Sequence, residues 1–165
     1  MILIVEDEVL IGLALRMVLR VAGYAVLGPA ATAEEALDLA QRRRPGLAFV
    51  DIDIAGARDG VALARELTTR YGTMCIFLTA QVERARQARE VAIGVMGKPY
   101  DPPELLQAVA AIHKGELPAR LPRRLELFHR AAIGTSSAQE AGRACARPYP
   151  HLPEPHAPRS ISRAR

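Results

Sequence analysis

The chain has 165 residues, half of them hydrophobic and only 4% aromatic, which is enough for one domain with a core of small aliphatic side chains. No apolar run approaches the roughly 20 residues that a membrane helix needs, and no basic region precedes the first apolar residues, so we expect neither membrane insertion nor a secretory signal. The net charge of +4 is uneven, because residues 1–114 hold 13 basic and 14 acidic residues, whereas residues 115–165 hold nine arginines and four acidic residues.

The first part of the chain alternates between strand and helix signals. Short apolar runs predict strands over Ile2–Val5 and Tyr24–Leu27. Apolar residues at helical spacing predict a helix over Leu10–Val21 between them. Thr32 begins a capping-box pattern, with a glutamate three residues later, and predicts a second helix that ends near Arg43.

The alternation continues to residue 114. Asp59 is a suitable N-cap for the third helix, and the Pro102-Pro103 pair suits the first turn of the last one. The remaining predicted strands are Leu47–Val50, Cys75–Leu78 and Ile93–Met96, and the remaining predicted helices are residues 60–71, 82–90 and 102–112. Five β/α units of this kind predict an α/β fold, a doubly wound parallel sheet with helices on both faces.

The composition changes after residue 114. The spacing of Leu121, Leu125 and Phe128 predicts one short amphipathic helix within residues 115–134. Residues 135–165 are rich in proline and arginine and too polar to bury a core, so we expect a disordered tail. The tail carries no zinc-ligand spacing and no recognition-helix pattern, so we do not expect sequence-specific DNA binding.

The two cysteines give an expectation about the compartment. Cys75 lies in a predicted core strand and Cys145 lies in the polar tail, so they are poorly placed to pair. A reducing cytoplasmic environment is the simplest interpretation.

Polar side chains follow four of the predicted strands. Glu6 and Asp7 follow the first strand and Asp51 the third, while Thr79 and Lys98 follow the last two. Because the carboxyl ends of parallel strands meet at one edge of a sheet, we expect these side chains to share a cleft. Clustered carboxylates repel one another unless a cation lies among them, and Mg²⁺ favours oxygen ligands and phosphate oxygens. The pattern therefore predicts a magnesium-dependent phosphoryl site.

Each of three residues has a predicted role at this site. Asp51 is the candidate nucleophile, since a carboxylate that attacks phosphorus forms an aspartyl phosphate. Lys98 can pair with the phosphoryl oxygens, and Thr79 can offer its hydroxyl to one of them.

The motifs that carry these residues resemble the receiver domain of two-component response regulators. The matching segments are V-E-D-E at 5–8, V-D-I-D at 50–53, D-G at 59–60, L-T-A at 78–80 and G-K-P-Y at 97–100. The resemblance covers residues 1 to about 114 and is to a stand-alone, chemotaxis-regulator-like receiver. It implies a flavodoxin-like sheet of five strands in the order 2-1-3-4-5, here followed by a C-terminal extension.

The resemblance also implies a mechanism. A sensor histidine kinase or a histidine phosphotransfer protein would phosphorylate Asp51, with Mg²⁺ held by Asp7, Asp51 and the backbone carbonyl of Asp53, and with Glu6 acting through water. The receiver would be a phosphoacceptor, not an enzyme with a separate substrate. It would signal by protein–protein contact through residues 82–112.

Three positions depart from the pattern of the family. Ile54-Ala55 stands where Met-Pro is usual, which is expected to alter the shape of the loop more than the chemistry. Val95 stands where an aromatic switch residue is usual, so the coupling of Thr79 to the partner surface is expected to differ. Asp53 adds an acid beside the phosphorylation site and is expected to change the lifetime of the acyl phosphate.

Two alternatives remain open from the sequence. A degenerate receiver would act as a binding module without phosphorylation, although intact Asp51, Thr79 and Lys98 argue against it. The segment D-I-D-I-A at 51–55 also resembles the motif of haloacid-dehalogenase-type phosphatases. That motif usually ends in Thr or Val, not in Ala55, and lies on the first strand.

Overall fold

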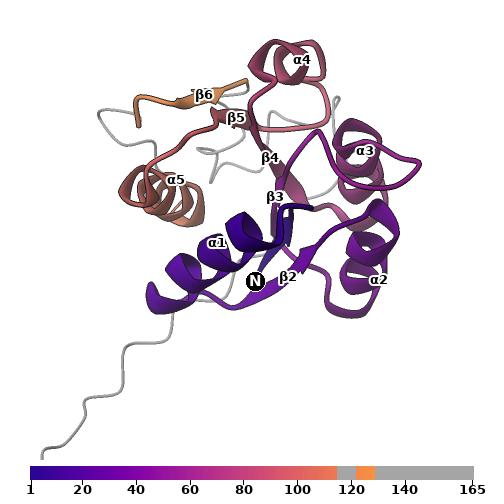
Figure 1. Ribbon diagram of the computed structural model, residues 1–165, viewed down its shortest axis with the longest axis horizontal. Helices are drawn as coiled ribbons and strands as arrows, with labels where there is room; N and C mark the ends of the chain where they lie inside the picture. Colours follow the sequence, from indigo (N-terminus) through magenta and orange to yellow (C-terminus); the bar gives the residue numbers. More distant parts are fainter. Residues whose placement is uncertain (115–121, 129–165) are drawn as a thin grey trace, which may run out of the picture.

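The computed structural model describes residues 1–114 and 122–128, and its centre is one six-stranded sheet (Figure 1). The strands are β1 (Ile2–Val5), β2 (Val26–Ala30), β3 (Leu47–Val50), β4 (Met74–Thr79), β5 (Gly94–Gly97) and β6 (Leu125–Leu127). Their order is β2-β1-β3-β4-β5-β6. The first five strands run parallel in the expected order, and β6 adds antiparallel to β5.

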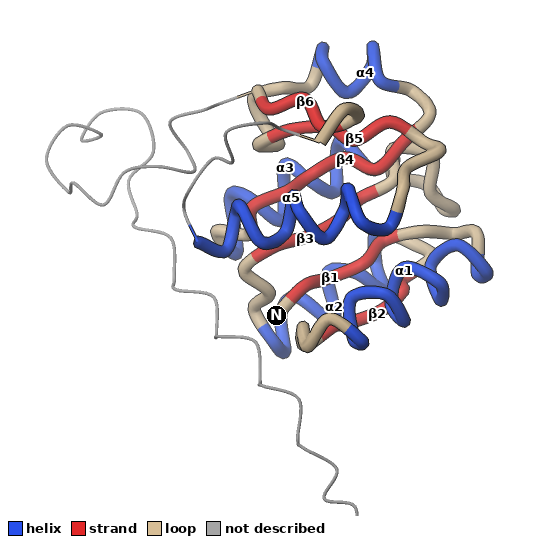
Figure 2. Tube along the Cα trace, turned by 90° about the vertical axis from the view of Figure 1, so that its left-hand side faces the viewer, coloured by secondary structure: helices blue, strands red, loops and turns tan. Residues whose placement is uncertain are grey.

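Helices cover both faces of the sheet (Figure 2). They are α1 (Val9–Val21), α2 (Ala33–Arg43), α3 (Gly60–Tyr71), α4 (Val82–Gln87) and α5 (Pro102–Lys114). Helices α1 and α5 pack on one face, against a cluster that contains Leu19, Phe49 and Val109. The other three helices pack on the opposite face, where alanines of α2 let that helix approach the sheet closely. This confirms the doubly wound α/β prediction.

Both predicted N-caps form. The hydroxyl of Thr32 accepts a hydrogen bond from the Glu35 amide at 3.2 Å, and the carboxylate of Asp59 accepts one from the Ala62 amide at 2.8 Å. The side chain of Glu35 reaches back to the amide of Ala31, one residue before the position that a capping box uses. These bonds satisfy amides that would otherwise be unpaired at the helix starts.

The buried face of α1 differs from the face that apolar spacing suggests. Gly12, Leu15 and Leu19 face the core, whereas the side chains of Leu10 and Met17 are 83% and 67% exposed. The helix is apolar on nearly every side, so periodicity alone does not identify its buried face. The exposed residues are Val9, Leu10, Leu13, Met17 and Val21.

The prediction of a helix within residues 115–134 is wrong where the structure describes that segment. Leu125–Leu127 form strand β6, so the sheet has six strands instead of five. The sequence Leu-Glu-Leu alternates with the period of a strand, and the open edge of β5 supplies its hydrogen-bonding partner. The expected disordered tail, residues 135–165, lies outside the described residues.

Smaller differences concern the ends of elements. Strand β2 begins at Val26, later than expected, because the register of β1 pairs Ile2 with Val26. Helix α4 ends at Gln87 instead of residue 90. Among the described residues, no helix combines the length and apolar character that crossing a membrane requires.

Candidate phosphoryl-acceptor site

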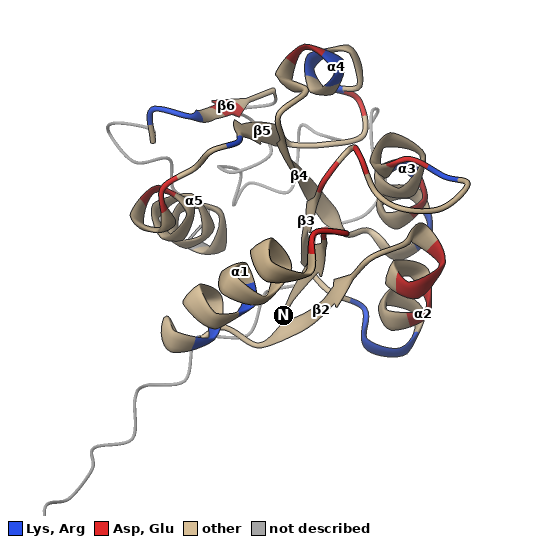
Figure 3. Cartoon of the chain, viewed as in Figure 1, with Lys and Arg blue, Asp and Glu red and all other residues tan. Residues whose placement is uncertain are grey.

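The predicted site residues meet at the carboxyl edge of the sheet. Strand register places the end of β1 beside the end of β3, with Val5 opposite Val50, so the acids that follow these strands become neighbours. The same register pairs Thr79 with Gly97 and brings Lys98 to this edge. Figure 3 shows acidic residues at the carboxyl ends of β1 and β3.

Three carboxyl groups form the centre of the site. Oxygen atoms of Glu6, Asp7 and Asp51 all lie within 4.8 Å of one another. Glu6 and Asp51 are buried, whereas Asp7 is exposed at the mouth. Two buried acids beside a third are unfavourable without a cation, and an all-oxygen donor set with an open side suits Mg²⁺ with its retained waters. The residues present therefore fit the ion that the sequence predicts.

Lys98 supplies a positive charge to this cluster. Its Nζ lies 2.6 Å from Oδ2 of Asp51 and 2.9 Å from Oε1 of Glu6. Burial lowers the pKa of Lys98, but the hydrogen bonds and charges of Asp51 and Glu6 outweigh this effect, and the net shift is upward. Burial raises the pKa of Glu6, and Lys98 opposes that rise. The pairing of Lys98 with Glu6 was not predicted from the sequence.

Thr79 is linked to Lys98 through the backbone. The carbonyl oxygen of Thr79 accepts a hydrogen bond from the Lys98 amide at 2.9 Å. The Thr79 hydroxyl is buried and accepts a hydrogen bond from the Gln81 amide at 3.1 Å. A hydroxyl that accepts in this way still has its own proton to donate to a phosphoryl oxygen.

The Asp53 side chain turns toward α4. Its amide donates to Oδ1 of Asp51 at 3.3 Å, whereas its carboxylate accepts a hydrogen bond from the Gln81 side chain and lies 3.8 Å from Arg84. Arg84 also pairs with Asp59, the N-cap of α3. The loop after β3 is therefore tied to the start of α4. The sequence does not single out Gln81 and Arg84, since neither residue type is diagnostic at the start of a polar helix.

Gly60 keeps the backbone of Asp51 in place. The Gly60 amide donates to the carbonyl oxygen of Ile52 at 2.9 Å. A Cβ atom added to Gly60 would lie 2.8 Å from the backbone carbonyl carbon of Asp51 and would contact its oxygen more closely still. The D-G pair at 59–60 thus combines a helix cap with a close approach of α3 to the end of β3.

Comparison with known proteins identifies the family. The family model described as the response regulator receiver domain matches residues 2–110. The transcriptional regulatory protein PdtaR of Mycobacterium tuberculosis is 36% identical over 113 residues, which are 66% of this chain and 54% of PdtaR. The phyllosphere-induced regulator PhyR of Methylorubrum extorquens is 35% identical over 103 residues, 61% of this chain and 39% of PhyR. The chain thus matches about half or less of these relatives.

Solved structures agree with this comparison. The receiver domain of NtrX from Brucella abortus has a TM-score of 0.62 at 29% identity and covers 67% of this chain and 95% of that one. The signal receiver domain of a modulated diguanylate cyclase from Desulfovibrio desulfuricans has a TM-score of 0.61 at 38% identity, with 66% and 89% covered. Fold, motif order and the family match agree, and the chain belongs to the response regulator receiver domain family, a component of two-component signalling.

Proposed function

We propose that Asp51 accepts a phosphoryl group and that the phosphorylated receiver signals by protein–protein contact. The observation that carries this proposal is the buried Asp51 carboxylate, which is held by Lys98 at 2.6 Å beside two further carboxyl groups. A lysine bound to a nucleophilic carboxylate is already placed where phosphoryl oxygens would arrive. The haloacid-dehalogenase alternative has less support, because D-I-D-I-A follows the third strand, whereas that motif lies on the first strand, and the segment falls within the match to the receiver family.

The transfer itself is a single displacement at phosphorus. A carboxylate oxygen of Asp51 forms the new O–P bond while the P–N bond to a donor histidine breaks and its electron pair returns to the imidazole. Lys98 balances charge on the transferred group, and the Thr79 hydroxyl donates to one of its oxygens. Mg²⁺, held by Asp7, Asp51 and the backbone carbonyl of Asp53 with Glu6 acting through water, would reduce the repulsion between the acids and the phosphoryl group.

A protein is the phosphodonor that this surface suits. Receiver family membership supports a histidine kinase or a histidine phosphotransfer protein. The exposed apolar stripe of α1, with Leu10, Leu13 and Met17, starts beside Asp7 at the mouth of the site. An apolar surface next to a charged site is typical of protein contact.

Labelling by a small phosphodonor tests the proposal directly. Incubation with acetyl phosphate and Mg²⁺ is expected to add one phosphoryl group to the wild type, as seen by intact-protein mass spectrometry, and none to Asp51→Asn. Asp53→Asn is the matched control, because it removes a neighbouring carboxylate and is expected to keep labelling. Equal labelling of wild type and Asp51→Asn contradicts the assignment, and an unlabelled wild type favours a phosphorylation-independent binding module.

Magnesium affinity is expected to depend on the exposed member of the carboxyl cluster. Asp7→Asn removes one negative charge at the mouth, and a charge a few ångströms from a divalent ion contributes enough for at least a roughly tenfold loss of affinity. Glu8→Gln, an exposed neighbour outside the cluster, is the control. The measurement is a Mg²⁺ titration followed by amide chemical shifts, and equal affinities for the two variants would count against the ligand assignment.

A further inference from the structure

The edge of β5, within the surface proposed for partner contact, is paired with a later segment of the chain itself. The surface proposed for partner contact, residues 82–112, contains α4, β5 and most of α5. Strand β6 pairs along β5, with Gly94 opposite Leu127 and Met96 opposite Leu125. Residues 122–128, here called the strap, lie outside the region matched by the family model.

Backbone hydrogen bonds fix the strap at both ends. The Phe128 amide donates to the Ile93 carbonyl oxygen at 2.9 Å, and the Gly97 amide donates to the Arg124 carbonyl oxygen at 3.3 Å. Without the strap, β5 would present an unpaired strand edge, which is a template for pairing with another chain. The strap and an added partner strand therefore compete for the same edge.

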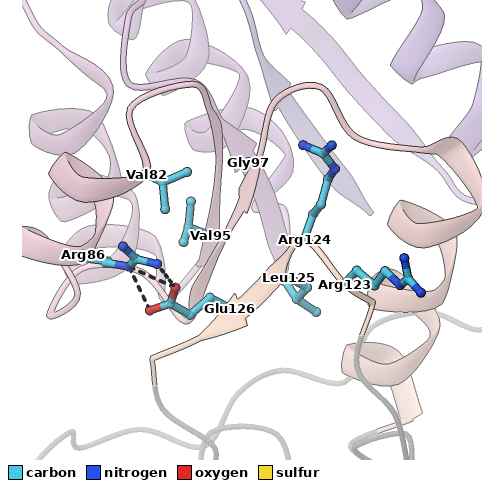
Figure 4. Close-up of a pocket in the computed structure, with 8 residues that line it drawn as sticks. All are labelled: Val82, Arg86, Val95, Gly97, Arg123, Arg124, Leu125 and Glu126. Atoms are coloured by element: carbon cyan, nitrogen blue, oxygen red, sulfur yellow. Dashed lines mark hydrogen bonds and ion pairs between the residues drawn. The ribbon is translucent and has the colours of Figure 1, made fainter.

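One ion pair ties the strap to α4. The Arg86 guanidinium contacts both carboxylate oxygens of Glu126, at 2.8 Å for the closest pair (Figure 4). Leu125 is buried against the α1/α5 side of the sheet. Arg86 also pairs with Glu83 within its own helix, so it keeps a partner when the strap leaves.

The strap is nevertheless held by few interactions. It pairs through only three residues, and its ion pair is about half exposed on both sides, which limits the contribution of that pair. A pocket of about 260 Å³ lies among α4, β5 and β6, and Val82, Val95 and Gly97 form part of its wall. The short side chain of Val95, where an aromatic residue is usual, leaves this region without a large ring.

The strap also touches the element that reaches the phosphoryl site. Gly97, whose amide is bonded to the strap, pairs with Thr79 across the sheet and directly precedes Lys98. A phosphoryl group on Asp51 adds new oxygens for Lys98 and Thr79 and so changes the contacts that fix the end of β5. Phosphorylation of Asp51 and pairing of the strap therefore both act on the carboxyl end of β5.

We propose that the strap is an autoinhibitory element, which covers the β5 edge in the unphosphorylated receiver and is released when Asp51 is phosphorylated. This rests on the proposed function of Asp51. If phosphorylation of Asp51 favours release of the strap, thermodynamic linkage requires that weakening the strap favours the phosphorylated state.

The test is hydrogen–deuterium exchange of the full chain at the Gly97 and Phe128 amides. Glu126→Arg places two cations together and is expected to raise exchange at both amides severalfold, whereas Glu83→Gln, which removes the other partner of Arg86, leaves them protected. Acetyl phosphate with Mg²⁺ is expected to raise exchange at the same amides in the wild type and not in Asp51→Asn.

Mass spectrometry of the same samples separates the two proposals. A protein that is labelled on Asp51 and keeps both amides protected overturns the release of the strap while leaving the phosphoacceptor intact. Absence of label overturns the proposed function and, with it, the regulatory link. Unchanged protection in Glu126→Arg overturns the role of the Arg86–Glu126 pair in holding the strap.

Discussion

Replacing Lys98 with methionine is expected to slow the labelling of Asp51 roughly a hundredfold and to lower the free energy of unfolding by about 3 kcal/mol at pH 8. The labelling effect follows from the loss of the ammonium that lies 2.6 Å from Asp51 and would face the phosphoryl oxygens. The stability effect arises because Glu6 and Asp51 stay buried after their cation is gone. Breaking one side of a buried ion pair leaves an uncompensated charge.

The stability loss is expected to depend on pH, and its direction follows from Glu6. Burial raises the pKa of this carboxyl group, and Lys98 opposes the rise, so the pKa is higher still in Lys98→Met. A carboxyl group whose pKa is higher in the folded state costs stability once it ionises, so stability falls as the pH rises from its unfolded value of roughly 4.3. The deficit of the variant is therefore small near pH 5 and larger near pH 8.

The pKa of Lys98 itself is raised, so its contribution in the wild type is fully present throughout that window. Urea unfolding at the two pH values in the presence of a chelator measures the effect without metal. Lys98→Arg keeps a cation and is the matched control, with a pH profile close to that of the wild type. A deficit in Lys98→Met that is equal at pH 5 and pH 8 would assign the loss to packing instead of charge.

Local rules predicted the part of the fold that positions the site. Thr32 and Asp59 were identified as helix starts from their own chemistry, and both accept the expected backbone hydrogen bond. The short apolar runs predicted five strands, because strands buried on both faces are continuous apolar segments. Because the strands are parallel, the polar residues that follow them lie together at the carboxyl edge of the sheet.

The sequence failed where the answer depends on distant partners. Helix α1 is apolar on nearly every side, and its packing against β1, β2 and α5 decides that Leu19 is buried and Leu10 is exposed. Leu125 to Leu127 can be placed on a helix or on a strand by their spacing, and the open edge of β5 decides between them. Short segments of this kind take their structure from tertiary contacts.

At the site, too, topology predicts some contacts and distant pairings determine others. Glu6, Asp7 and Asp51 were grouped from topology alone, and the structure brings their oxygens within 4.8 Å. The hydrogen bond between Lys98 and Glu6 is not predictable from the sequence, because the two residues are 92 positions apart. The sequence does not predict the contact of Arg84 with Asp53 either, since one arginine in a polar helix has many possible neighbours.

Gly60→Ala is expected to lower the free energy of unfolding by roughly 3 kcal/mol and to slow the labelling of Asp51 in the protein that remains folded. The added methyl group would lie 2.8 Å from the carbonyl carbon of Asp51 and from the Cα of Ile52, and closer still to the carbonyl oxygen of Asp51. Backbone at the end of a buried strand has little freedom to move. Relief of the contact must shift either α3 or the end of β3. A shift of β3 moves the Asp51 carboxylate away from Lys98.

Gly72→Ala is the matched control, because it makes the same chemical change at the other end of α3. Gly72 has a φ of +67° and would place its Cβ in open space, so the expected cost is about 1–2 kcal/mol from the left-handed backbone alone. Urea unfolding and acetyl phosphate labelling of both variants separate the two causes. If Gly72→Ala slowed labelling as much as Gly60→Ala, general loss of stability would explain both. Slower labelling in Gly60→Ala alone would show that the close approach of α3 to β3 positions the acceptor.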